Sequence, residues 1–241
     1  MFITFIWKET MASNIEETLR QQYQEKYSAY FQVERHEMLQ YIPLESRTIL
    51  DVGCGCGNFS ELLKKSRPVE VWGVELDKQA ANVAASKLDR VICAAFDSGL
   101  NLPIQGFDCI VFNDVLEHMV DPFSALLYAE KLLRDGGVVV ASIPNVRYFV
   151  TMWDLLVHKN WKYADWGVLD RTHLRFFTCR SIISTFSDLG YQIEEIEGIN
   201  PIEKVHPALL RRFRFLNRVL LNKIEDMRYL QFAVVARPQN S

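Results

Sequence analysis

The 241-residue sequence predicts an α/β fold with helices on both faces of a mainly parallel sheet. Beyond residue 47, short apolar runs rich in β-branched residues alternate with helical stretches. These runs are apolar almost throughout, as is typical of strands buried on both faces. The first run leads into a loop with glycine at every second position, and a helix follows. We therefore expect a doubly wound sheet with a ligand site at the carboxyl ends of its strands.

The alternation predicts each element in turn. Five runs are predicted as strands, at 48–52, 69–74, 91–95, 107–112 and 138–143. Helices are predicted between them at 59–65, 78–88 and 122–134, and a later helix at 178–189 is flanked by strands at 191–196 and 230–236. The helix at 122–134 has clear boundaries, because Asp121 is a natural N-cap, Pro122 suits the first turn, and Gly136 with Gly137 is expected to end the helix.

Composition limits the class of protein. Apolar residues make up 49% of the chain and charged residues 24%, which supports a sizeable core and one domain over 1–241. The formal net charge of −3 argues against nucleic acid as a partner. The five cysteines lack the spacing of a disulfide framework, which favours reduced thiols and a cytoplasmic location. Cys54 and Cys56 could form a redox or metal pair, but small residues in a tight loop explain them more simply.

Segments at the start of the chain and after the fifth strand do not fit the alternation. Residues 1–7 are apolar but too few to span a bilayer, and we expect an extension over residues 1–10. Residues 11–43 are predicted as helical, with aromatics on one face that either pack on the domain or form a flap over a ligand. Residues 147–172 are rich in aromatics, and we expect a lid with its own small core.

A second insert at 201–228 separates the last two predicted strands. Its segment 209–227 is predicted as an amphipathic helix, with Arg211, Arg214 and Arg218 away from the apolar stripe. Packing on the sheet or dimerisation would explain this pattern, so the chain is expected to be a monomer or a homodimer. The same pattern would also suit a peripheral contact with anionic lipid.

The glycine loop departs from the dinucleotide-binding pattern. That pattern, G-x-G-x-x-G, is matched by Gly53 and Gly55, but Asn58 stands where the third glycine belongs and Gly57 comes one residue early. Asp51 precedes the first glycine, and its carboxylate would repel a phosphate and attract an ammonium group. The loop therefore favours a cofactor with a cationic amino-acid end.

Further carboxylates follow the carboxyl ends of the next three strands. Glu75 ends the second strand, where a contact to ribose hydroxyls is expected for a nucleoside cofactor. Asp97 follows the third strand and could accept a hydrogen bond from an adenine amino group. Asp114 follows the fourth strand, in the run Asn113-Asp114-Val115-Leu116-Glu117-His118.

In these motifs the chain resembles class I S-adenosylmethionine-dependent methyltransferases, most strongly over 48–143. The resemblance implies a Rossmann-like seven-stranded sheet of order 3-2-1-4-5-7-6, with the seventh strand antiparallel. It implies S-adenosylmethionine as cofactor, with the glycine loop at its methionine part. The cofactor-binding residues that it implies are Asp51, Gly53, Cys54, Gly55, Gly57, Glu75, Leu76, Asp97, Ser98, Asn113, Asp114 and Val115.

The acceptor of the methyl group is less well indicated. The run 169–178 resembles a segment of a bacterial subgroup that acts on sugars, lipids or other small molecules, so a hydroxyl of a small-molecule, sugar- or lipid-linked acceptor is expected. Within that run His173 is our candidate catalytic residue, as a general base or a group that orients the substrate, and a structural role is the alternative. His118 is expected to be structural or at the edge of the cofactor, and His158 to lie on the surface.

Other functions were weighed against this one. An N-P-P-aromatic motif, typical of enzymes that methylate nucleic-acid amino groups, does not follow the fourth strand. A carboxylate cluster of the metal-dependent catechol type is not evident either, so no metal is predicted. An NAD(P)-dependent oxidoreductase and a non-catalytic interaction module with the same fold are the alternative functions.

Overall fold

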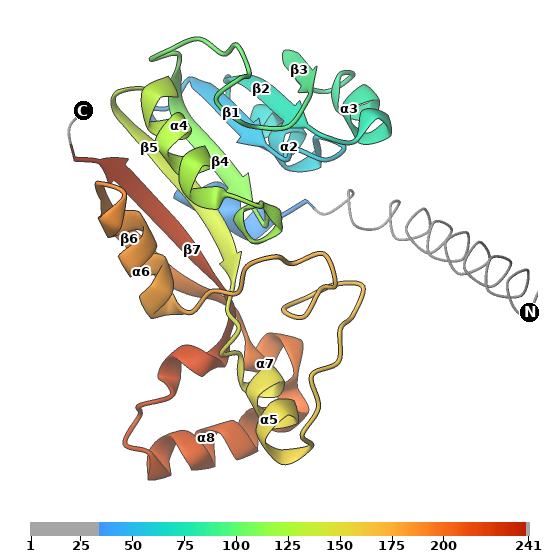
Figure 1. The fold of residues 1–241 in the computed structure, drawn as a ribbon, viewed down its shortest axis with the longest axis vertical. Helices are drawn as coiled ribbons and strands as arrows, with labels where there is room; N and C mark the ends of the chain where they lie inside the picture. The colour runs from blue at the N-terminus through green and yellow to red at the C-terminus, as the bar shows by residue number, and fades with distance from the viewer. Residues whose placement is uncertain (1–33, 240–241) are drawn as a thin grey trace, which may run out of the picture. The chain divides into compact units, whose positions relative to one another are not determined.

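The computed structural model describes residues 34–239, which form one seven-stranded sheet of order β3-β2-β1-β4-β5-β7-β6 (Figure 1). Its strands are β1 (Thr48–Val52), β2 (Glu70–Glu75), β3 (Arg90–Cys93), β4 (Phe107–Asn113), β5 (Leu133–Pro144), β6 (Tyr191–Pro201) and β7 (Tyr229–Pro238). Strand β7 runs antiparallel to β5 and β6, and the pairings among β1 to β5 are parallel. The predicted strand order and the antiparallel seventh strand are confirmed.

Helices cover both faces of this sheet. They are η1 (His36–Tyr41), α2 (Asn58–Ser66), α3 (Lys78–Ala84), η2 (Leu116–His118), α4 (Pro122–Leu132) and α6 (Cys179–Asp188). Alternate strand residues enter two separate cores, because successive side chains point to opposite faces. Ile110 packs with the buried residues of α4 and α6, whereas Cys109 and Val111 pack with those of α2, α3 and η1. The doubly wound prediction is therefore correct, and the carboxyl ends of the parallel strands are left for ligands.

The end of α4 differs from the prediction. The helix stops at Leu132, and β5 begins at the next residue by pairing Leu133 with Phe107. Gly136 has φ +77° inside β5, so the glycine pair accommodates an irregular start of the strand rather than a helix C-cap. Helix α3 is also shorter than predicted, since it ends at Ala84 and the chain continues in turns.

The two inserts pack together at the end of the sheet where β5 stops (Figure 1). They contain α5 (Phe149–Val157), α7 (Ile202–Val205), η3 (Pro207–Leu209), α8 (Leu210–Val219) and η4 (Glu225–Arg228). Buried Tyr148 and Phe149 from the first insert share a small core with Phe213 and Met227 from the second. The prediction of one amphipathic helix over 209–227 is wrong. Helix α8 ends at Val219, and the chain then turns at Leu221 and Asn222, which both have positive φ.

Several predictions concern residues that the structure does not describe. The extension at 1–10 and most of the helical flap at 11–43 lie there, and within the flap only residues 34–43 are described.

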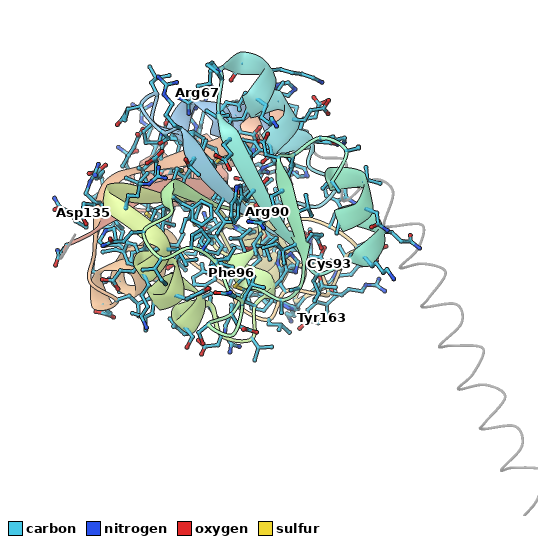
Figure 2. The ribbon with its side chains drawn as sticks, turned by 90° about the horizontal axis from the view of Figure 1, so that it is seen from above. Arg67, Arg90, Cys93, Phe96, Asp135 and Tyr163 are labelled. Carbon is cyan, nitrogen blue, oxygen red and sulfur yellow. The ribbon has the colours of Figure 1, made fainter. Side chains whose placement is uncertain are left out.

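All five cysteines lie in the described part and are free thiols. In Figure 2, Phe96 lies among the side chains of the interior, whereas Asp135 and Tyr163 lie at the periphery. Among residues 34–239, no helix is long and apolar enough to cross a membrane.

Candidate active site

The loop between β1 and α2 depends on glycine at three positions. Gly53, Gly55 and Gly57 have φ of +67°, +54° and +74°, a region that residues with a Cβ rarely adopt. A Cβ at Gly53 would lie 2.6 Å from Cγ2 of Val115, so this glycine also allows the chain after β4 to pack against the loop. The loop and the segment that follows β4 are therefore in direct contact.

Cys54 has a packing role in this loop. Its side chain is 8% exposed, and a Cβ at Gly73 of β2 would lie 2.6 Å from its Sγ. Burial raises the pKa of the Cys54 thiol well above its usual range, so the thiol stays protonated and unreactive. This environment supports the simpler explanation of the Cys54 and Cys56 pair.

Asp51 is a buried carboxyl group at the carboxyl end of β1. It is 2% exposed, and its Oδ2 accepts a hydrogen bond of 2.6 Å from the Ser60 hydroxyl of α2. Burial raises the pKa of Asp51 to about 7, against the opposing effect of the Ser60 hydrogen bond and with a smaller contribution from the charge of Glu75. A cation bound beside Asp51 would favour its ionised form.

Glu75 connects the glycine loop to the end of β2. Its Oε2 accepts from the Gly55 amide and its Oε1 from the Asp77 amide, each at 2.8 Å. Burial raises the pKa of Glu75, although both amide hydrogen bonds oppose this shift. A carboxylate offers about four lone-pair positions, so two amide bonds leave capacity for two hydroxyl donors. This geometry fits the ribose contact that the resemblance implies.

The residues implied for the nucleoside end are more open to solvent. Leu76 is 73% exposed, and the side chains of Asp97 and Ser98 are exposed as well. Asp97 Oδ1 accepts a hydrogen bond of 2.8 Å from the Gly99 amide, which orders the loop after β3. Neighbouring Phe96 fixes this loop to the domain through edge contacts with Phe112.

The last residue of β4 carries a buried amide, and the residue after it carries a tightly bound carboxylate. Both polar side-chain atoms of Asn113 are buried, and within residues 34–239 they have no hydrogen-bond partner, as expected of a group that binds a ligand. Asp114, at φ +55°, accepts from Gln231 at 2.6 Å and from the Ser142 hydroxyl at 3.0 Å. Its Oδ2 lies 3.1 Å from a guanidinium nitrogen of Arg35.

Arg35 and Gln231 were not predicted as site residues. They lie 79 and 117 positions from Asp114 in the sequence, and only the fold brings them to it. No local pattern around either residue could have identified them. They hold the side chain of Asp114 from two directions, so that its main role in the described structure is to fix the segment after β4.

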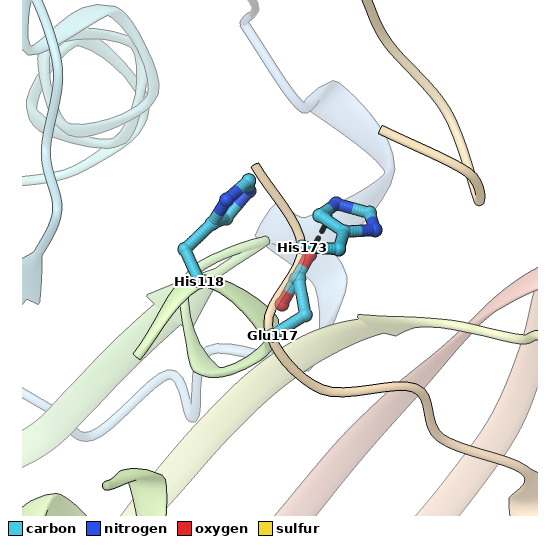
Figure 3. A group of neighbouring side chains, drawn as sticks. All are labelled: Glu117, His118 and His173. Atoms are coloured by element: carbon cyan, nitrogen blue, oxygen red, sulfur yellow. Dashed lines mark ion pairs between the residues drawn. The ribbon is translucent and has the colours of Figure 1, made fainter. Parts of the chain in front are cut away.

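Three titratable side chains gather beside this segment (Figure 3). They are Glu117, His118 and His173, here called the Glu-His-His cluster, and one potential ligand atom of each lies within 4.8 Å of the others. Nε2 of His173 is 3.9 Å from Oε1 of Glu117, and the rings of the two histidines meet edge to face at 4.6 Å. The predicted catalytic residue His173 therefore belongs to a group that also includes two residues of η2.

Burial dominates the electrostatics of this cluster. Glu117 is 1% exposed, and within the described chain neither of its carboxylate oxygens has a hydrogen-bond partner. Burial raises the pKa of Glu117 well above its usual range, with a further contribution from the charge of Asp114. Burial also lowers the pKa of His118, and the neighbouring His173 lowers it further. Sequence analysis named Glu117 only as part of a run, because its burial became evident only in the fold.

The chain around His173 is held on η2. The amides of Leu174 and Arg175 both donate to the carbonyl oxygen of Glu117, at 2.8 and 3.0 Å. Asp170 accepts from the amide and the hydroxyl of Thr172, at 2.8 and 2.7 Å. Arg171 pairs with Asp165 of the first insert at 2.7 Å, and exposed His158 lies on the surface as predicted, 2.9 Å from Asp154.

Comparison with known proteins agrees with this architecture. Residues 22–196, more than half of the chain, match a protein family whose description is "Methyltransferase domain". A ubiquinone biosynthesis O-methyltransferase of Hydrogenovibrio crunogenus is 28% identical over 198 residues, 76% of each protein. A trans-aconitate 2-methyltransferase of Methylobacterium radiotolerans is 32% identical over 111 residues, 45% of this chain and 43% of that protein. The crystal structure of a SAM-dependent methyltransferase from Archaeoglobus fulgidus superposes with a TM-score of 0.65 at 20% identity, covering 89% of this chain and 97% of that one.

The sheet order, the glycine loop and the family match together define the class of protein. The chain belongs to the methyltransferase-domain family. It is a class I S-adenosylmethionine-dependent methyltransferase, and S-adenosylmethionine is its cofactor.

Proposed function

We propose that this methyltransferase transfers the methyl group to a hydroxyl oxygen of a small molecule. The observation that carries the proposal is the Glu-His-His cluster, which lies beside the segment after β4. Methylation of a hydroxyl requires loss of its proton, whereas the sulfonium supplies a methyl group that is already reactive. The O-methyltransferase of Hydrogenovibrio crunogenus described above is consistent with an oxygen acceptor.

The cofactor is proposed to lie along the carboxyl ends of β1, β2 and β4. Asp51 would attract its ammonium group, the glycine loop would contact its methionine part, and Glu75 would bind its ribose hydroxyls. The buried amide of Asn113 supports a ligand contact on the same side. Asp97 and Ser98, in the loop after β3, are proposed at the adenine.

His173 is proposed to act on the acceptor. Its side chain is only 5% exposed, and its Nδ1 donates to the carbonyl oxygen of Val168 at 3.0 Å. The opposite nitrogen, Nε2, is the one that is directed toward Glu117. The ring is thus fixed in one orientation, which suits a general base or a group that orients the acceptor.

The test of this function is transfer of labelled methyl from S-adenosylmethionine to two panels of small molecules. One panel carries phenolic or sugar hydroxyls, including lipid-linked ones, and the other carries carboxylic acids. We expect labelled methyl ethers, and we expect His173→Ala to lower turnover while the affinity for S-adenosylhomocysteine stays near wild type. Methyl esters alone, or full turnover by His173→Ala, would contradict the proposal.

The second insert is proposed to contact a lipid surface. Phe215, Val219 and Leu221 are 69%, 61% and 80% exposed, so they do not belong to the stripe that packs inward. Two residues of the apolar stripe predicted over 209–227, Phe213 and Met227, are instead buried in the small core of the inserts. Exposed arginines lie on the same helix at 211, 212, 214 and 218. Exposed apolar side chains between arginines suit the surface of an anionic bilayer.

A further inference from the structure

We propose that the Glu-His-His cluster is a binding site for one divalent transition-metal ion, which would hold the acceptor hydroxyl. The sequence predicted no metal, because a carboxylate cluster of the metal-dependent catechol type is not evident in it. The structure brings together a different set of donors, one carboxylate and two imidazoles. Such mixed nitrogen and oxygen sets suit zinc, cobalt, iron or manganese.

The first support is the state of Glu117. Its carboxylate is almost fully buried, and within residues 34–239 no hydrogen bond reaches either oxygen. A buried carboxylate without hydrogen bonds is costly unless a proton or a cation compensates it. Two imidazoles within ligand distance make a metal cation the partner that uses all three groups.

The second support is how the two imidazoles are held. His118 Nδ1 lies 3.2 Å from the carbonyl oxygen of Thr172, and His173 Nδ1 lies 3.0 Å from that of Val168. Because a carbonyl oxygen only accepts, both rings are expected to carry their proton on Nδ1. In that tautomer Nε2 carries the lone pair that binds a metal. Metal-binding histidines usually have their second nitrogen held in this way.

A further hydrogen-bonded shell supports His118. The Thr172 hydroxyl lies 3.1 Å from His118 Nδ1 and donates to buried Asp170 at 2.7 Å. This chain of contacts orients the ring from behind and strengthens it as a ligand.

The distances are compatible with a metal site that closes on binding. Zinc–nitrogen and zinc–oxygen bonds are about 2.0–2.2 Å, so neighbouring ligand atoms lie about 3–3.5 Å apart around the ion. Nε2 of His173 and Oε1 of Glu117 are 3.9 Å apart, and the whole set lies within 4.8 Å. Side-chain rotations that shorten these distances by about 1 Å would complete the site, and three protein ligands leave positions for the acceptor.

This inference rests on the proposed function and decides how His173 acts in it. A metal ion lowers the pKa of a bound hydroxyl, so the hydroxyl proton can pass to water without a direct base. The oxygen lone pair then forms the new bond to the methyl carbon. The carbon–sulfur bond breaks, and its electron pair stays on sulfur. His173 would orient the acceptor through the ion rather than accept its proton.

The test is titration of the full chain, free of a histidine tag and treated with chelator, with CoCl2. We expect one Co²⁺ per chain, detected by visible absorption bands, and displacement by Zn²⁺. Glu117→Gln and His173→Ala should weaken Co²⁺ binding more than tenfold. Thr172→Val, which leaves the three ligand side chains in place and removes the hydroxyl between His118 and Asp170, should weaken it by about 10- to 100-fold. His158→Ala, at an exposed histidine directly after α5, should bind like the wild type.

Binding of S-adenosylhomocysteine is measured on the same samples, to separate this proposal from the proposed function. If the wild type binds S-adenosylhomocysteine but not Co²⁺, the metal site is refuted and the methyltransferase assignment stands. Equal Co²⁺ affinity in wild type, Glu117→Gln and Thr172→Val would also refute the site. Thermal unfolding of each metal-free variant shows whether it is folded, and Thr172→Val keeps the test decisive if a ligand variant is not.

Discussion

At the scale of single residues, the site is built from acidic groups whose burial is unfavourable to the protein alone. Asp51, Glu75 and Glu117 are 2%, 6% and 1% exposed, and burial raises the pKa of each of them. Such carboxyl groups are retained when a ligand compensates them. The cofactor's ammonium and ribose are proposed to do so for the first two, and a metal ion for the third.

Asp51→Asn is expected to stabilise the cofactor-free protein in a pH-dependent way. The unfolded chain loses this proton near pH 3.8, whereas the folded chain keeps it up to about 7. The folded state therefore binds more protons in this window, and its stability falls as pH rises. Three pKa units correspond to an upper limit of about 4 kcal/mol at pH 8.

Thermal or urea unfolding of wild type and Asp51→Asn at pH 5 and pH 8 measures this effect. The variant should gain stability relative to wild type at the higher pH, while its affinity for S-adenosylhomocysteine falls because the ammonium loses its partner. A stability difference that does not change with pH would show that Asp51 is ionised in the folded protein at both values.

Gly53→Ala is expected to destabilise the protein more than Gly190→Ala. Both glycines have positive φ, at +67° and +81°, so both substitutions carry a similar backbone cost of about 1 kcal/mol. Only at Gly53 would the new Cβ meet a neighbour, Val115, whereas nothing lies within 4 Å at Gly190. Urea unfolding should show an additional loss of about 1–3 kcal/mol at Gly53, partly recovered in Gly53→Ala with Val115→Ala. Equal losses at the two glycines would mean that Val115 moves away without cost.

At the scale of elements, the sequence was sufficient where a local pattern determines the structure. Most of the strands follow from apolar runs, and acidic residues at or directly after the carboxyl ends of β1, β2 and β4 mark the expected ligand side of the sheet. The Glu-His-His cluster could not be assembled in this way, because His173 comes from a distant segment held on η2 by backbone hydrogen bonds. The early end of α8 was missed because its apolar period continues past Val219, where the chain turns.

The lipid contact proposed for α8 belongs to this scale. Replacing Arg211, Arg214 and Arg218 with Glu should reduce co-sedimentation with phosphatidylglycerol vesicles by at least tenfold, since each basic residue contributes about 1 kcal/mol near an anionic surface. Phe215→Ser should weaken binding without changing its dependence on salt. Arg180→Glu, at an exposed position of α6, is the control and should bind like the wild type. Vesicle binding that is absent in wild type, or unaffected by the triple variant, would exclude the contact.

At the scale of the whole molecule, the sheet and the inserts have separate cores joined by few residues. Asn145 is fully buried at the end of β5 and donates to the carbonyl oxygens of Asp226 and Tyr229, at 2.8 and 3.0 Å. The proposed cofactor side is built on strand ends of the sheet and the loops that follow them, whereas the proposed acceptor side depends on the segment that returns from the first insert. This division explains how one family can keep its methyl donor while the acceptor varies.

Calorimetric titration with S-adenosylhomocysteine tests most directly whether the carboxyl ends of β1 and β2 hold S-adenosylmethionine, as proposed. The wild type should bind one molecule per chain, and Glu75→Ala should weaken binding at least tenfold through loss of the ribose contact. Glu70→Ala is the matched control, because Glu70 is exposed at the other end of the same strand. If Glu75→Ala binds S-adenosylhomocysteine with wild-type affinity, this cofactor site is contradicted. Binding of NAD(P) without any binding of S-adenosylhomocysteine would contradict it as well.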